Sequence, residues 1–127
     1  MRYVFREFPL DIKAAAASVL ARCIAKDDAG KYFAVVDMLF RQQESWVLKN
    51  TTETLTRIGK QAGLTQQAVE DCLKDQAMQD KISAGQKYAE DVLKVEGTPT
   101  FFINGDEIVG ETAFEEFAKR INAPLKS

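Results

Sequence analysis

The chain has 127 residues and a mass of 14.2 kDa, which is the size of one domain. Hydrophobic residues make up 46% and charged residues 28%, so the chain can build a core and disorder is not expected. The net charge is −2 and no basic block is present, so we expect no nucleic acid partner. No apolar stretch is long enough to cross a membrane, and the charged N-terminus does not resemble a signal peptide.

Histidine is absent, and only two cysteines are present. The lack of histidine excludes nucleophile arrangements that use an imidazole base and zinc sites that need an imidazole ligand. Cys23 and Cys72 are 49 positions apart, so they form neither a CxxC redox pair nor part of a four-thiolate zinc site. We therefore expect no metal and no cofactor.

The first part of the chain predicts a strand followed by helices. Aromatic and β-branched residues in Arg2–Phe8 favour a strand that ends at Pro9. Asp11 is expected to cap a helix whose apolar stripe includes Cys23. The next helix is expected over about 31–43, with Asn50-Thr51-Thr52 ending that segment. Three more helices are expected: one that bears Leu55 and Ile58 and closes at Gly63, one that is capped by Thr65 and carries Cys72, and one over about 76–94.

The periodicity changes from helix to strand at Thr98. Residues 98–103 and 106–109 flank Asn104-Gly105, the dipeptide most typical of a tight β-hairpin turn. Thr112 and Glu115 have the spacing of a capping box that opens a last helix, with Pro124 beyond its end. A helical block separates the predicted strand at residues 2–8 from this hairpin in the sequence. A single strand and a hairpin make a poor sheet unless a further strand pairs between them.

The string Gly97-Thr-Pro-Thr-Phe-Phe-Ile-Asn-Gly105 resembles the DsbA-like branch of the thioredoxin superfamily. Residues 2–10 resemble the strand and exit segment that follow its active-site helix, and residues 12–94 resemble its helical subdomain. The resemblance implies one domain over 1–127 with an incomplete thioredoxin-like α/β fold that is mostly helical. It implies thiol-disulfide exchange with extended protein or peptide substrates, in the periplasm or another extracytoplasmic compartment.

The resemblance also assigns the site residues. Pro99 matches a cis-proline that faces the redox CxxC, and Thr98 matches the residue that tunes this pair and offers backbone groups to substrate. The alternative for Pro99 is a trans proline at the start of a strand. The family's first strand and CxxC helix would precede Arg2, so we expect a fragment with no catalytic residue in this chain.

Cys23 and Cys72 resemble a second, non-catalytic pair found in the helical subdomain of some relatives, which implies a structural disulfide. The alternative is two free buried cysteines that act as small apolar residues. The acidic pairs Asp27-Asp28 and Glu115-Glu116 are expected to have solvated structural roles at helix ends.

Two other functions are weighed against disulfide exchange. One is a non-catalytic thioredoxin-like module that binds peptides or self-associates. The other is a kappa-type glutathione transferase relative, against which the Thr98 before the proline and the short helical block both argue. Because the central strand of the sheet is missing from the expected fold, we also expect a homo-oligomer.

Overall fold

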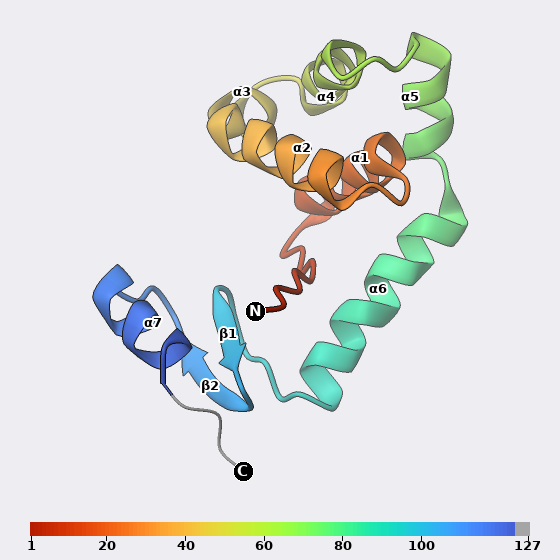
Figure 1. Cartoon of the computed structure of the whole chain (residues 1–127). Helices are drawn as coiled ribbons and strands as arrows, with labels where there is room; N and C mark the ends of the chain where they lie inside the picture. The colour runs from red at the N-terminus through yellow and green to blue at the C-terminus, as the bar shows by residue number, and fades with distance from the viewer. Residues whose placement is uncertain (124–127) are drawn as a thin grey trace. The chain divides into compact units, whose positions relative to one another are not determined.

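The computed structural model of the protein (Figure 1) describes residues 1–123. Within this range the fold is mostly helical, with one antiparallel pair of strands. No helix in this range is both long and apolar enough to cross a bilayer. The elements in chain order are α1 (Ile12–Ala25), α2 (Ala29–Arg41), α3 (Gln43–Leu48), α4 (Thr51–Gln61), α5 (Gln66–Leu73), α6 (Gln76–Asp91), β1 (Thr100–Ile103), β2 (Asp106–Val109) and α7 (Phe114–Ile121).

These elements form two compact units, and the boundary between them falls within α6. The first unit runs from Met1 to Gln86 and contains helices α1 to α5 and the first part of α6. The second unit begins at Lys87 and contains the β1–β2 hairpin and α7. Each unit has its own apolar contacts.

Helix α1 lies at the centre of the first unit, where it packs against α2, α4 and α5. Leu20 of α1, Leu55 and Ile58 of α4, and Val69 of α5 are almost completely buried. Burial of each such side chain contributes about 1.5–3 kcal/mol. The indole of Trp46 is also buried, and its Nε1 donates a hydrogen bond of 2.8 Å to the carbonyl oxygen of Leu39. The core therefore joins residues that are far apart in the sequence.

Side-chain caps set where four of these helices begin. In each case the capping oxygen accepts a hydrogen bond from the backbone N–H three residues later, which satisfies one of the free amides of the first turn. The capping residues are Asp11 for α1, Asp28 for α2, Asn50 for α4 and Thr65 for α5. The helical segment before Asn50 ends as expected, with α3 ending at Leu48, and Asn50 also begins the next helix. The short helix α3 was not expected, because it follows α2 after the single residue Gln42.

The predicted strand at Arg2–Phe8 is wrong: this segment pairs with no strand within residues 1–123. Its aromatic side chains instead lie against α2, with the ring centroids of Tyr3 and Phe33 5.5 Å apart and those of Phe5 and Tyr32 6.0 Å apart. Residues with high β-propensity form a strand only where a neighbouring strand supplies backbone partners. Here the same residues obtain their apolar contacts from a helix.

The hairpin of the second unit has the expected turn. Asn104 and Gly105 both have positive φ, 51° and 89°, as a two-residue turn of this hand requires. Phe101 of β1 lies opposite Ile108 of β2. The Phe101 ring packs edge-on against the ring of Phe117 in α7, with the ring centroids 4.6 Å apart. Helix α7 therefore covers one face of the hairpin.

The predicted capping box at Thr112–Glu115 does not form. Helix α7 begins at Phe114, one residue too late for that spacing, and its N-cap is Ala113 without a side-chain hydrogen bond. The Thr112 hydroxyl instead donates to the carbonyl oxygen of Gly110 at 3.2 Å. Pro124 lies outside the described residues.

Gly59 gives a direct test of the packing between α4 and α5. A Cβ atom at Gly59 would lie 2.6 Å from Cγ2 of the stiff, buried Val69. We expect Gly59→Ala to lower the free energy of unfolding by about 1–3 kcal/mol in chemical denaturation. A Cβ atom at Gly85 of α6 would have no neighbouring atom within 4 Å. Gly85→Ala should therefore raise the free energy of unfolding by up to about 1 kcal/mol. Equal effects of the two variants would contradict this packing.

Candidate functional site

The loop before β1 holds Thr98 and Pro99 at the surface. Both residues are exposed, and the peptide bond between them is cis. On one side of the loop the Thr100 hydroxyl donates to the carbonyl oxygen of Gly97 at 2.7 Å. On the other side the Gly110 N–H donates to the carbonyl oxygen of Pro99 at 2.8 Å. These two bonds fix the loop while leaving Thr98 and Pro99 accessible.

Cys23 and Cys72 are joined in a disulfide in the first unit, which links α1 to α5. Their Cα atoms are 6.1 Å apart, within the range that a disulfide can bridge. Cys72 is buried and Cys23 is half-buried. Because this bond uses both cysteines of the chain, these 127 residues hold no free thiol in this state.

A buried carboxylate, Glu7, ties the N-terminal segment to the helices. It accepts hydrogen bonds from Arg22 Nε at 2.6 Å, Arg22 Nη2 at 2.7 Å and the Tyr32 hydroxyl at 2.9 Å. Burial by itself would raise the pKa of Glu7, but the hydrogen bonds from Arg22 and Tyr32 outweigh it and hold the pKa below the ordinary value of 4.5. Burial and the adjacent Glu7 carboxylate raise the pKa of the Tyr32 phenol.

Sequence reasoning missed this group of three side chains. Glu7 is separated from Arg22 by 15 positions and from Tyr32 by 25, so no local spacing connects them. The predicted strand also gave Glu7 a different environment. The only available signal was an acidic residue inside an otherwise aromatic segment.

One residue of each acidic pair, Asp28 and Glu116, has a structural contact. The Asp28 carboxylate caps α2 by accepting the N–H of Lys31 at 3.0 Å. The Glu116 carboxylate pairs with Arg120 one turn later at 3.0 Å. Within residues 1–123, no three side chains of metal-ligating type come together.

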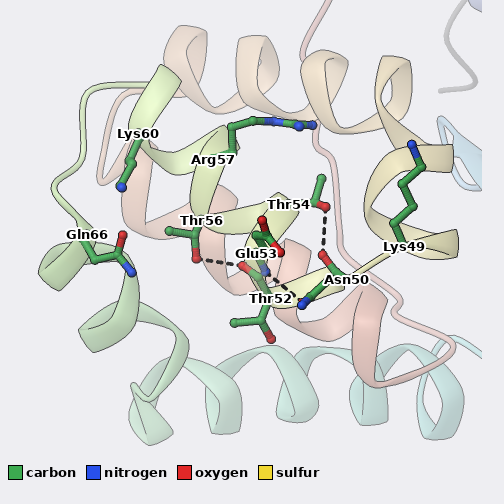
Figure 2. Close-up of a pocket in the computed structure, with 9 residues that line it drawn as sticks. All are labelled: Lys49, Asn50, Thr52, Glu53, Thr54, Thr56, Arg57, Lys60 and Gln66. Carbon is green, nitrogen blue, oxygen red and sulfur yellow. Dashed lines mark hydrogen bonds between the residues drawn. The ribbon is translucent and has the colours of Figure 1, made fainter.

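An open depression of about 660 Å³ lies around the start of α4 (Figure 2). Several of its polar groups bond to one another: Asn50 Oδ1 accepts the N–H of Glu53, the Thr54 hydroxyl donates to the Asn50 carbonyl, and the Thr56 hydroxyl donates to the Thr52 carbonyl. These bonds cap and extend the helix. The depression is therefore the outer surface of a helix start rather than a built binding site.

A helical block, the Thr98–Pro99 loop, a hairpin and a helix that packs against the hairpin follow one another along the chain. A family model described as Thioredoxin matches residues 1–123. The chain belongs to the thioredoxin family.

Curated relatives come from Rickettsia species and bear the name "putative protein-disulfide oxidoreductase". The Rickettsia bellii relative is 36% identical over 104 residues, which cover 81% of this chain and 39% of the relative. The Rickettsia felis relative is 32% identical over 125 residues, which cover 98% of this chain and 44% of the relative. The chain thus spans about two-fifths of the length of these relatives. No solved structure matches it significantly.

The disulfide should supply a large share of the stability of the first unit. Replacing both Cys23 and Cys72 with alanine should lower the free energy of unfolding by about 4 kcal/mol, because the bond closes a loop of about 50 residues. Denaturation with and without dithiothreitol measures this effect. The reductant should destabilise the unaltered chain and leave the double variant unchanged. This role would be refuted if reduction of the disulfide in the unaltered chain left its free energy of unfolding unchanged.

Glu7 should make stability depend on pH in a defined direction. Its pKa is lower in the folded than in the unfolded state, so its contribution is complete above the unfolded pKa and is lost as the pH falls through the folded pKa. Glu7→Gln should cost about 1–3 kcal/mol at neutral pH. This difference from the unaltered chain should shrink below about pH 5.

Urea unfolding at several pH values measures the contribution of Glu7. The control is Glu44→Gln, because Glu44 is exposed and lies in the same unit. That variant should follow the unaltered chain at each pH. A loss of unfolding free energy in Glu7→Gln that grows as the pH falls would contradict this pH dependence.

Proposed function

We propose that this protein takes part in DsbA-like thiol-disulfide exchange with extended polypeptides in an oxidising, extracytoplasmic compartment. The observation that carries the proposal is the exposed Thr98–Pro99 loop, fixed by its two flanking hydrogen bonds, in a chain of the thioredoxin family. The names of the Rickettsia relatives support the reaction class. The disulfide between Cys23 and Cys72 suits an oxidising compartment.

In this proposal Thr98 and Pro99 are the substrate-binding residues. Within residues 1–123, the backbone N–H and C=O of Thr98 have no hydrogen-bond partner, and the residue is exposed. An extended polypeptide can pair with such groups in the manner of an added strand. That pairing would hold a substrate cysteine beside the loop without selecting a particular side chain.

The redox step needs a thiolate that these 127 residues do not provide. Disulfide exchange proceeds by attack of a thiolate on a disulfide sulfur, which releases the other sulfur as a thiolate. Both cysteines of this chain are bonded to each other, and no CxxC pair is present. In the proposal, this chain therefore contributes the polypeptide-binding loop, and the reactive pair comes from outside these residues.

A second candidate is a non-catalytic thioredoxin-like module that binds peptides. It is favoured by the absence of a free thiol in this chain. Both candidates need the loop to bind extended polypeptide, and they differ in whether disulfide exchange follows. Addition of a separate CxxC-containing peptide distinguishes them, because only the first predicts faster reduction of a bound disulfide substrate.

Loosening the loop should weaken peptide binding. Thr100→Val keeps the side-chain shape but removes the hydrogen bond to Gly97 that fixes the loop. We expect a labelled, carboxymethylated insulin B chain to bind this variant about fivefold more weakly, because one hydrogen bond contributes about 1 kcal/mol. Fluorescence anisotropy measures the affinity. Thr56→Val is the matched control, since it removes a similar threonine bond to Thr52 in α4.

Two results would count against the proposal. One is peptide binding that is equally strong in the Thr100→Val variant, the Thr56→Val variant and the unaltered chain, because the loop would then not be the binding element. The other is rapid insulin reduction by this chain alone with dithiothreitol, because the reactive pair would then lie within these residues.

A further inference from the structure

The tip of the β1–β2 hairpin carries an asparagine followed directly by a glycine, Asn104 and Gly105. Both residues are exposed, and a Cβ atom at Gly105 would have no neighbouring atom within 4 Å. Within residues 1–123, neither the Asn104 side chain nor the Gly105 N–H makes a hydrogen bond. No local contact therefore keeps the side-chain amide of Asn104 away from the nitrogen of Gly105.

The chemistry open to this pair is the closure of a five-membered ring. The nitrogen of the residue after an asparagine can attack the side-chain amide carbon, Cγ, and the product is a succinimide. A side chain on the attacking residue crowds this step, and glycine has none. The other asparagines of the chain, Asn50 and Asn122, precede a threonine and an alanine. Asn50 is also held by its capping bond to the N–H of Glu53, so Asn104 is the asparagine best placed to react.

The conformation of the turn gives a route to ring closure. Positive φ at both Asn104 and Gly105, 51° and 89°, defines a type I′ turn. The type II′ turn also joins two strands through two residues, and it keeps the positive φ of the first residue. The two turns differ by a flip of the peptide plane between their central residues. Gly105 permits this flip, because glycine adopts positive and negative φ about equally well.

The flip places the reacting atoms together. In a type II′ turn the first central residue has φ of about +60° and ψ of about −120°. At this ψ the Cα–Cβ bond is eclipsed with the following C–N bond, as a five-membered ring through these atoms requires. The φ of Asn104 already fits this turn. Ring closure thus leaves Ile103 opposite Asp106 and does not require the ladder to open.

We propose that Asn104 deamidates spontaneously in the folded hairpin and becomes a mixture of aspartate and isoaspartate. The Gly105 nitrogen bonds to Asn104 Cγ as the bond from Cγ to Nδ2 breaks, and ammonia leaves with the proton of the Gly105 N–H. Water then opens the ring at Cγ to give aspartate, or at the main-chain carbonyl carbon to give isoaspartate. The overall change takes up one water and releases one ammonia. This inference does not depend on the proposed function.

The isoaspartate product changes the connection between the strands. Its main chain runs through the former side-chain carbons, so the turn is longer by one methylene group and carries a carboxylate. Because a two-residue turn fixes the register of its hairpin, the longer connection weakens the adjacent pair Ile103–Asp106. The same ladder ends at the bond from Gly110 N–H to the Pro99 carbonyl. Deamidation at the tip should therefore loosen the hairpin that displays the loop.

Mass-spectrometric peptide mapping of the full chain during storage at neutral pH tests the site. We expect Asn104 to convert at least about tenfold faster than Asn50 or Asn122, which corresponds to a barrier lower by about 1.4 kcal/mol. Conversion of Asn104 at the same rate as these two residues would overturn the proposal.

Two comparisons test whether the folded turn itself reacts. In native buffer Asn104 should convert within about tenfold of its rate in guanidinium chloride, since the flip needs no unfolding. Ile108→Ala removes buried apolar contacts of β2 and should leave the native rate unchanged. A larger gap between the two solvents, or faster conversion in Ile108→Ala, would show that the hairpin must open first and would refute the proposal. If this variant fails to fold, the comparison of solvents decides.

Amide hydrogen exchange tests the consequence for the hairpin. The isoaspartyl chain, separated by chromatography, should exchange faster than the unaltered chain at the paired residues Phe101 and Ile108. Asn104→Asp is the matched control, because it adds the same charge without lengthening the main chain and aspartate tolerates positive φ. That variant should exchange like the unaltered chain. Equal exchange in the isoaspartyl chain and in Asn104→Asp would refute the predicted loosening.

Discussion

The first unit depends on the contacts that α1 makes on its several sides. Its apolar face packs against α2, α4 and α5, and Cys23 bonds it covalently to Cys72 of α5. Arg22, the residue of α1 directly before Cys23, binds the carboxylate of Glu7 and so fixes the N-terminal segment. One helix therefore carries the apolar, covalent and ionic links of this unit. The short helices around it can remain short because each needs to bury a single face against α1 or its neighbours.

The local features of the fold could be predicted from the sequence because they depend on a few adjacent residues. Asp11 and Thr65 begin helices as expected, and Asn104-Gly105 forms the expected hairpin turn. The segment at Arg2–Phe8 could not be predicted, because its state depends on whether a strand or a helix lies beside it. The bonds of Glu7 depend on that same distant packing. The family was indicated by Gly97–Gly105, where loop, strand and turn occur within nine residues.

The candidate loop and the hairpin are mechanically one structure. The bond from Gly110 N–H to the Pro99 carbonyl is both the end of the β1–β2 ladder and one of the two bonds that fix the loop. Any change that frays the hairpin should therefore also alter how Thr98 and Pro99 are displayed.

The use of both cysteines in one disulfide affects how covalent capture of this protein should be interpreted. In many thiol-exchange proteins an alkylating reagent or a trapped mixed disulfide marks the reactive residue. In this chain, any such adduct on Cys72 requires that the bond between α1 and α5 has first been broken, since the cysteine is otherwise paired and buried. An adduct would thus record the opening of a helical core, and its rate of formation would measure the persistence of that core under reducing conditions.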